Sequence, residues 1–199
     1  MKIALLGATG RTGSHVLSIA LDRGHEVVAL VRGEPPQQRS GLTVVKGSAV
    51  EKVDVARAAE GCDAVVSCLA SSNKEAVCSR AAEAAIAAGA SRFVTVGGAG
   101  VDVEGDEKGF GDKVIGGIMK VVVGRMLADR QRELELLQQS AVRWTMARPP
   151  RLTDAAGSDY RTSLERPPST AIGREALATF IVDELERDAF VGKAPFVAA

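Results

Sequence analysis

Aromatic residues make up only 4% of the 199 residues, although 46% of the chain is hydrophobic, so the core has to be built mainly from Ala, Val, Leu and Ile. No apolar run approaches the ~20 residues that a membrane-spanning helix needs. The apolar run near the N-terminus is also too short for the hydrophobic region of a signal peptide. We therefore expect a cytoplasmic location and no membrane partner.

Neither sign of charge is in excess, since Lys plus Arg and Asp plus Glu both number 25. Such a chain has no global field that would attract nucleic acid, and we expect no nucleic-acid partner. Cysteine and histidine are also scarce. Cys62, Cys68 and Cys78 form no C-x-x-C pair, and the only histidines are His15 and His25. This pattern favours neither a disulfide framework nor a metal site.

The most informative stretch is a glycine-rich turn that follows the apolar run 2–6 and opens a helical pattern through residue 21. A buried strand, a glycine turn and a helix start, in that order, form the phosphate-binding unit of dinucleotide-binding folds. Gly7 would allow a tight turn, Gly10 would let the backbone approach a pyrophosphate, and Gly13 would let the helix pack on the strand. The turn therefore predicts a dinucleotide cofactor.

Arg32 directly follows a second apolar strand, expected over residues 27–31. At about 20 residues beyond the glycines, NAD-binding folds place an acidic residue on the ribose hydroxyls, whereas an arginine suits the 2′-phosphate of NADP. Arg32 therefore favours NADP(H), and Arg11 inside the turn could share the phosphate. The alternative is a solvated arginine at the end of a strand.

Further strands are expected over residues 64–66, 92–96 and 144–147. The first delivers residues 67–70, and the second residues 97–100, to the carboxyl edge of the sheet, where ligands of doubly wound folds bind. Both stretches are candidate cofactor contacts, although small residues at a strand end are also ordinary turn residues. The third strand stops at Arg148-Pro149-Pro150, because proline cannot continue a central ladder.

Together these elements predict an α/β fold, a Rossmann-like doubly wound parallel sheet with helices on both faces, in a single domain of residues 1–199. Residues 151–170 are expected to form a small C-terminal cap on the substrate side. A helix over 174–186 and a terminal strand over 190–197 should follow. Another helix, running to Ala88, is expected to be capped by Asn73 or a neighbour.

Residues 101–124 combine acidic residues, glycines and apolar residues. We interpret this stretch as a lid over the site or as a patch for a protein partner, with an ordinary packed helix as the alternative. The helix expected over 125–139 carries a charged face that includes Asp129, Arg130 and Glu133. Most of that face is expected to be solvated.

Four segments together resemble the NAD(P)-binding, NmrA-like group of atypical short-chain dehydrogenases/reductases, and within it the biliverdin reductase B/flavin reductase-like members. They are GATGRTG (7–13), HEVVALVR (25–32), VGGAG (96–100) and WTMARPP (144–150), and the similarity covers nearly the whole chain in the same order. The resemblance implies NADP(H) as the cofactor. With the glycine turn, it predicts as cofactor-binding residues Gly7, Thr9, Gly10, Arg11, Thr12, Gly13, Arg32, Cys68, Leu69, Ala70, Gly97, Gly98 and Pro149.

The chain departs from that group where the chemistry would be done. The Tyr-x-x-x-Lys pair of short-chain dehydrogenases is absent, because Leu164 lies four residues after Tyr160. Gly97 and Gly98 occupy the place of the catalytic serine, and Arg130 stands where related reductases can have a histidine. Oxidation of an alcohol needs a group that takes its proton, so alcohol dehydrogenation and sugar epimerisation are disfavoured.

Hydride delivery to a conjugated acceptor asks less of the protein, because the acceptor can stabilise charge or take a proton from solvent. We therefore predict an NADPH-dependent reductase for a planar small-molecule acceptor such as a flavin, a quinone or a biliverdin-like compound, with no single residue assigned as catalytic. The alternative is a non-catalytic NADP(H)-binding redox sensor that reports to a protein partner.

Overall fold

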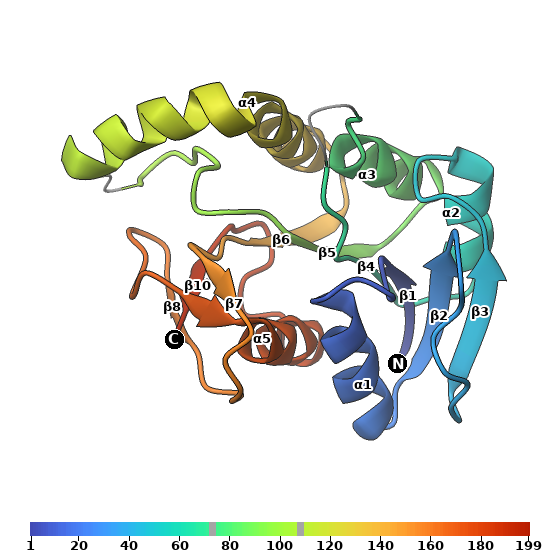
Figure 1. Cartoon of the computed structure of the whole chain (residues 1–199). Helices are drawn as coiled ribbons and strands as arrows, with labels where there is room; N and C mark the ends of the chain where they lie inside the picture. Colours follow the sequence, from blue (N-terminus) through green and yellow to red (C-terminus); the bar gives the residue numbers. More distant parts are fainter. Residues whose placement is uncertain (72–74, 107–109) are drawn as a thin grey trace.

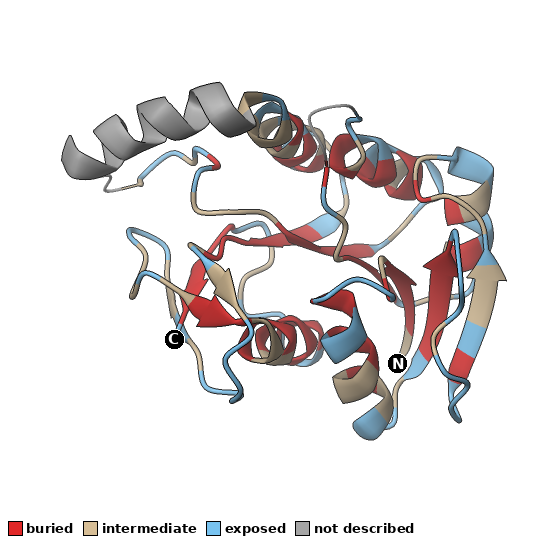
Figure 2. Ribbon diagram, viewed as in Figure 1, coloured by how far each residue is buried: buried red, intermediate tan, exposed pale blue. Residues whose placement is uncertain are grey.

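A computed structural model describes the backbone of residues 1–71, 75–106 and 110–199, and the side chains of these residues apart from 110–123 (Figures 1 and 2). Its centre is a six-stranded sheet with the order β3-β2-β1-β4-β5-β6, in which all neighbouring strands are parallel. The strands are β1 (Lys2–Leu6), β2 (Glu26–Val31), β3 (Leu42–Lys46), β4 (Ala64–Ser67), β5 (Arg92–Val96) and β6 (Arg143–Ala147). This is the Rossmann order, and the predicted doubly wound sheet is confirmed.

Helices cover both faces of the sheet (Figure 1). They are α1 (Gly13–Asp22), α2 (Lys52–Ala59), α3 (Cys78–Ala87), α4 (Phe110–Gln138) and α5 (Arg174–Arg187). Helices α1 and α5 pack together on one face, whereas α2 packs on α3, and α3 on α4, across the other. The predicted helix over 174–186 therefore matches α5, and the helix expected over 125–139 is the C-terminal part of α4.

The central strand β1 shows why the sheet strands are apolar throughout. Ile3 and Leu5 belong to the core formed with α1 and α5, whereas Ala4 and Leu6 belong to the core on the opposite face. Ile3 is also paired on both sides, with Val27 of β2 and with a residue of β4. A strand that is covered on both faces and both edges has no solvated side, so its sequence does not alternate between apolar and polar residues (Figure 2).

Residues 151–170, here called the cap segment, lie beside α5 and pair with neighbouring parts of the chain (Figure 1). Within them β7 (Leu152–Thr153) pairs with β9 (Ile172–Gly173), and β8 (Arg161–Ser163) pairs antiparallel with β10 (Phe196–Ala198). The terminal strand expected over 190–197 is thus mostly wrong. Before β10, the chain runs beside β6 through a few backbone hydrogen bonds and one isolated bridge, between Lys193 and Thr145, without forming a regular strand.

A buried arginine follows β6 and ties three segments together. Arg148 is 0% exposed, and its guanidinium donates to both carboxylate oxygens of Asp106, at 2.7 and 2.8 Å. Its Nε donates to the carbonyl of Ala194 at 2.7 Å, and its guanidinium carbon lies 3.8 Å from the centre of the Phe196 ring. Arg148 therefore connects the loop after β5 to the last residues of the chain.

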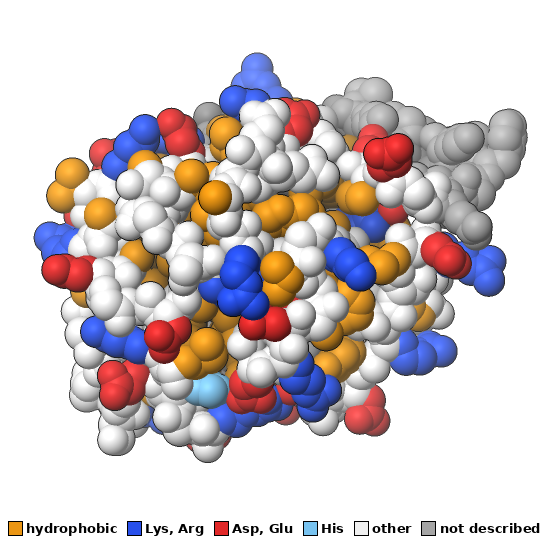
Figure 3. All heavy atoms as spheres, turned by 180° about the vertical axis from the view of Figure 1, so that it is seen from behind, with side chains coloured by type: hydrophobic (Ala, Val, Ile, Leu, Met, Phe, Trp, Pro, Cys, Tyr) orange, Lys and Arg blue, Asp and Glu red, His pale blue; other side chains and the backbone are white. Residues whose placement is uncertain are grey.

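Basic and acidic side chains are intermixed over the face shown in Figure 3. Among the described helices, none is both long enough and apolar enough to cross a membrane. The lid or partner patch expected within 101–124 falls largely on residues 107–123, whose side chains lie outside the described part of the chain.

Candidate functional site

A cavity of about 1260 Å³ opens at the carboxyl edge of the sheet. Its walls come from the turn after β1, the ends of β2, β4 and β5, helix α4 and the cap segment. At this edge the connection after β1 runs through α1 to β2 on one side, and the connection after β3 runs through α2 to β4 on the other. Ligands of doubly wound sheets bind where two such connections diverge. The volume exceeds the roughly 300–1,000 Å³ of ordinary small-ligand pockets, so the cavity has room for a ligand larger than an ordinary small molecule.

All the predicted cofactor-binding residues except Gly13 and Pro149 line this cavity. Gly13 lies behind the turn, where it starts α1. Pro149 is buried beside the cavity and accepts a hydrogen bond from the amide of Ala99 at 3.0 Å, while the next residue, Pro150, lines the wall.

The glycine turn has no room for a side chain at Gly7 or Gly13. Gly7 has a φ of +86°, and the amide of Gly10 donates to the Gly7 carbonyl at 3.0 Å. A Cβ on Gly13 would lie 2.0 Å from that same carbonyl oxygen, so only glycine lets α1 start this close to β1. Thr12, the N-cap of α1, makes no side-chain capping hydrogen bond. The open turn and the uncapped helix start fit the pyrophosphate of a dinucleotide.

Arg32 is exposed at the end of β2 and lines the same cavity. Within the described part of the chain, no hydrogen bond or ion pair occupies its guanidinium. Its donors are therefore available to a ligand at the β2 side of the cavity.

The ends of β4 and β5 form the floor. Burial raises the pKa of the Cys68 thiol to about 12, an effect that Arg130 only partly opposes, so this thiol stays protonated and is no nucleophile. Gly97 is required by packing, because a Cβ there would lie 2.8 Å from the side chain of Met146. Gly98 has no described atom within 4 Å of such a Cβ and leaves space in the cavity. After β5, Gly97 therefore allows close packing on Met146, whereas Gly98 keeps the cavity open.

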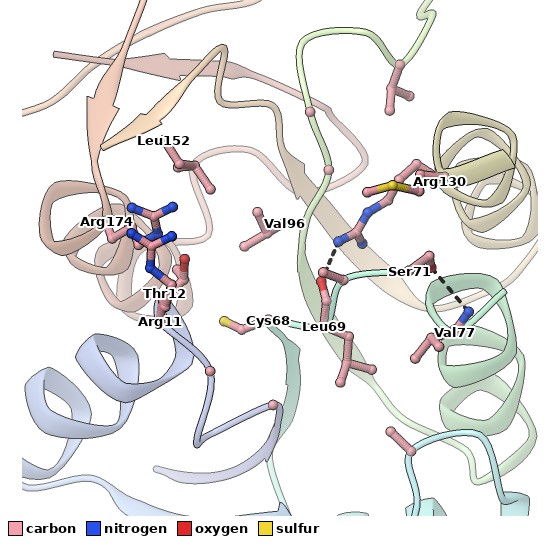
Figure 4. A pocket seen from close by; sticks show the side chains of 18 of the residues that line it. Arg11, Thr12, Cys68, Leu69, Ser71, Val77, Val96, Arg130, Leu152 and Arg174 are labelled. Atoms are coloured by element: carbon pink, nitrogen blue, oxygen red, sulfur yellow. Dashed lines mark hydrogen bonds between the residues drawn. The ribbon is translucent and has the colours of Figure 1, made fainter. Parts of the chain in front are cut away.

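The charged face of α4 was expected to be solvated, and this prediction is wrong for its inner part. Glu133 is 0% exposed, and the Arg130 side chain is 12% exposed. Arg130 donates to the carbonyl of Leu69 at 2.5 Å (Figure 4). It also donates to one Glu133 oxygen at 2.7 Å, while Thr95 donates to the other Glu133 oxygen at 2.8 Å. These contacts place a cation inside the cavity, next to the end of β4.

Asp129 on the same face of α4 caps a different helix. Its carboxylate accepts hydrogen bonds from the hydroxyls of Ser71 and Ser79 and from the amides of Cys78 and Ser79, at 2.9 and 3.2 Å for the amides. Helix α3 begins at Cys78, and the expected capping residue Asn73 lies outside the described residues. The start of α3 is therefore held by a carboxylate from α4, on the wall of the cavity that Ser71 and Val77 line.

We expect Asp129→Ala to lower the free energy of unfolding by about 1.5–3 kcal/mol, the usual cost of losing hydrogen bonds to a charged group. Burial alone would raise the pKa of Asp129, but the hydrogen bonds from Ser71, Ser79 and the backbone of α3 outweigh it and hold this pKa below its usual value. Because the folded-state pKa is the lower one, the stabilisation is complete above the ordinary carboxyl pKa of about 4 and is lost as the pH falls through the folded-state value.

Urea denaturation of both proteins near neutral pH and below about pH 4 measures this effect. The difference in the free energy of unfolding between wild type and Asp129→Ala should shrink in acid. Asp159→Ala, which removes an exposed carboxylate, should change this free energy little at either pH. A difference that stays constant or widens in acid would contradict the assignment.

The cap segment supplies the wall that the sequence did not predict in detail. Its apolar part consists of Leu152 and Pro167, together with Phe196 of β10. Beside them, Arg174 of α5 and Arg11 of the glycine turn both line the cavity (Figure 4). Both also pair with Asp154. No sequence motif marks Arg174, which reads only as the first residue of a helix.

Tyr160, the single tyrosine, does not line the cavity. Its hydroxyl donates to Asp183 at 2.6 Å, and its ring packs edge-on against Phe180. Burial, together with the hydrogen bond to Asp183, raises the pKa of Tyr160 to about 12. This tyrosine therefore packs the cap segment onto α5. Among the described residues, none is placed as the tyrosine–lysine acid/base pair of an alcohol dehydrogenase.

Comparisons with known proteins agree with this geometry. A candidate exported protein from Burkholderia pseudomallei has a solved structure that is 27% identical, with a TM-score of 0.76 and 100% of both chains covered. ChuY, an anaerobillin reductase from Escherichia coli O157:H7, is 19% identical with a TM-score of 0.80, covering 100% of this chain and 97% of its own. A candidate NADH-flavin reductase from Streptococcus pneumoniae TIGR4 is 23% identical with a TM-score of 0.77, covering 100% and 99%.

The two reductases, both under 25% identical, share the fold with this chain. The curated relatives that match in sequence do so over short stretches, and the chain spans about a quarter of their length, 26% and 24% for two of them. The model of the NAD(P)H-binding family matches residues 7–188, from the glycine turn to the end of α5. Since this match includes nearly the whole chain, the protein belongs to the NAD(P)H-binding family.

Proposed function

We propose that the chain binds NADP(H) in the cavity and reduces a planar conjugated acceptor, such as a flavin, a quinone or a bilin-type compound. The observation that carries the proposal is a single cavity that extends from the glycine turn to an apolar compartment lined by Val96, Leu152 and Phe196. The sequence has no tyrosine–lysine pair that could take a proton from an alcohol there. ChuY and the candidate NADH-flavin reductase, which share the fold, are named for acceptors of this kind.

The residues present fit an extended dinucleotide. The pyrophosphate would lie over the turn of Gly7 and Gly10 at the start of α1, and the 2′-phosphate would meet Arg32 at the end of β2. The nicotinamide would then lie along the ends of β4 and β5, where Gly98 leaves space. When bound, the reduced nicotinamide supplies the hydride.

The chain itself supplies orientation, a water-poor compartment and charge. Val96, Leu152 and Phe196 surround the acceptor side with apolar surface. Arg130, fixed by Glu133 and the Leu69 carbonyl, places a cation where negative charge develops on the acceptor. The Cys68 thiol is a weak acid and Tyr160 lies outside the cavity, so we expect solvent to supply the proton that completes the reduction.

Stopped-flow oxidation of NADPH in the presence of flavins, quinones or biliverdin tests the proposal. We expect one of these classes to be reduced at a rate that saturates with acceptor concentration. Tight binding of NADPH without turnover of any acceptor would reject the reductase and leave a protein that only binds the dinucleotide.

We expect Arg32→Glu to weaken NADPH binding by about 1.5–3 kcal/mol, the value of a charged hydrogen-bonding contact, while NADH binding changes much less. Calorimetric titration of both dinucleotides measures the effect. Arg151→Glu is the matched control, because Arg151 is an exposed arginine that does not line the cavity. Equal losses for NADPH and NADH would show that Arg32 does not bind the 2′-phosphate.

A further inference from the structure

Two arginine side chains far apart in the sequence meet at one wall of the cavity and share a single carboxylate. Arg11 belongs to the glycine turn, and Arg174 is the first residue of α5. Arg174 Nη1 donates to Asp154 Oδ1 at 2.6 Å, and Arg11 Nη2 donates to Oδ2 of the same carboxylate. Figure 4 shows both guanidinium groups on the wall beside Thr12. The two side chains thus form one cluster at the starts of α1 and α5.

This cluster retains charge and donors on its cavity side. Two guanidinium groups carry two positive charges against the one negative charge of Asp154, and within the described residues no other acceptor bonds either side chain. Asp154 does not line the cavity and its side chain is 68% exposed, so it holds the arginines from the solvent side. Slight burial works to raise the pKa of Asp154, but Arg11 and Arg174 outweigh it and keep this pKa below its usual value. The carboxylate is therefore ionised at neutral pH.

We propose that Arg11 and Arg174 form a binding site for an anionic group, a phosphate or a carboxylate, of a molecule held in the cavity, and that Asp154 positions the pair. The inference rests on the proposed function and names which acceptors the cavity prefers. Planar guanidinium groups match phosphate and carboxylate oxygens with paired N–H donors, and both arginines stand at helix starts, where the helix dipole favours an anion. Asp154 offsets the repulsion that would otherwise separate the two cations.

Two sources of the anion fit this place, namely the charged tail of an acceptor and the pyrophosphate of the cofactor. FMN and riboflavin share one ring system and differ by a phosphate, so their binding tests the site without any turnover. With NADP⁺ present, we expect the wild type to bind FMN at least about tenfold more tightly than riboflavin and Arg174→Gln to lose this preference. Titration of flavin fluorescence measures both affinities.

Calorimetric titration of NADP⁺ into the same variant separates the sources. If Arg174→Gln loses affinity for FMN alone, the anion belongs to the acceptor. If it loses about tenfold in affinity for NADP⁺ alone, the anion is the pyrophosphate of the cofactor. Either outcome supports the site. Arg174→Lys keeps the positive charge but lacks the planar guanidinium, so its affinity for the anionic ligand should lie between those of wild type and Arg174→Gln. This variant also allows the test if Arg174→Gln does not fold.

Arg161→Gln is the matched control, since Arg161 is an exposed arginine of β8 that does not line the cavity. The proposal is overturned if Arg174→Gln changes neither the FMN-to-riboflavin ratio nor the NADP⁺ affinity more than this control does. If no acceptor is reduced while the FMN preference is present and depends on Arg174, the reductase fails and the anion site stands.

Discussion

Gly13→Ala is expected to destabilise the protein by on the order of 3 kcal/mol and to abolish dinucleotide binding. The added Cβ would lie 2.0 Å from the carbonyl oxygen of Gly7 and 2.8 Å from its carbonyl carbon, and both are backbone atoms that no side-chain rotation can move away. Either α1 shifts outward or the turn changes shape. Both responses displace the backbone amides that would face the pyrophosphate. Thermal unfolding and calorimetric titration with NADPH measure the two effects.

Gly124→Ala provides the control for this substitution. Gly124 lies within α4, and no described atom comes within 4 Å of a Cβ built there. Alanine should therefore stabilise that helix by roughly 0.5–1 kcal/mol, as it does in helix interiors generally. If Gly13→Ala is as stable as Gly124→Ala and still binds NADPH, the tight contact between α1 and β1 has no role in the fold or the site.

Asp106→Ala is expected to lower the free energy of unfolding by about 3–5 kcal/mol, because it leaves the guanidinium of Arg148 buried without a counter-charge. Asp106 accepts two hydrogen bonds from this arginine, and the remaining contacts of Arg148 that the structure describes are backbone carbonyls and the Phe196 ring. Urea denaturation followed by circular dichroism measures the loss.

The double variant Asp106→Leu/Arg148→Met removes both charges and should recover part of the stability, since replacing a buried pair costs less than breaking it. Asp159→Ala removes an exposed carboxylate and should stay within about 0.5 kcal/mol of wild type. A loss for Asp106→Ala no larger than that of Asp159→Ala would show that Arg148 finds solvent or another partner.

Local sequence patterns predicted the sheet and the part of the candidate site formed by the glycine turn, Arg32 and the ends of β4 and β5. The glycine spacing predicted the turn because each glycine answers a backbone requirement that acts within a few residues, such as the positive φ of Gly7. Uniformly apolar strands predicted a sheet covered on both faces, and Arg32 was located because it directly follows such a strand. The carboxyl ends of β4 and β5 could be placed at the cavity because parallel strands share one edge.

The other half of the site depends on contacts between segments that are distant in the sequence. Arg130 and Glu133 are three residues apart on one helix, a spacing that allows them to pair, but it does not show that the pair is buried at the end of β4. Likewise, nothing in the sequence shows that Asp129 faces the start of α3. Arg174 and Asp154 are 20 residues apart, and Arg11 is 143 residues from Asp154. The three side chains meet only because the fold brings the cap segment next to the glycine turn. Buried or shared charges of this kind follow from tertiary packing, which helical periodicity does not encode.

The place of β1 in the middle of the sheet would, under the proposed function, separate the choice of dinucleotide from the choice of acceptor. Arg32 belongs to the half of the cavity built from β2, whereas Arg130 and Gly98 belong to the half built from β4, β5 and α4. No described hydrogen bond links Arg32 to the second half, so substitutions on the two sides should combine additively in free energy. If the proposed function holds, substitutions that change the preferred dinucleotide and substitutions that reshape the acceptor side can be selected separately and then combined.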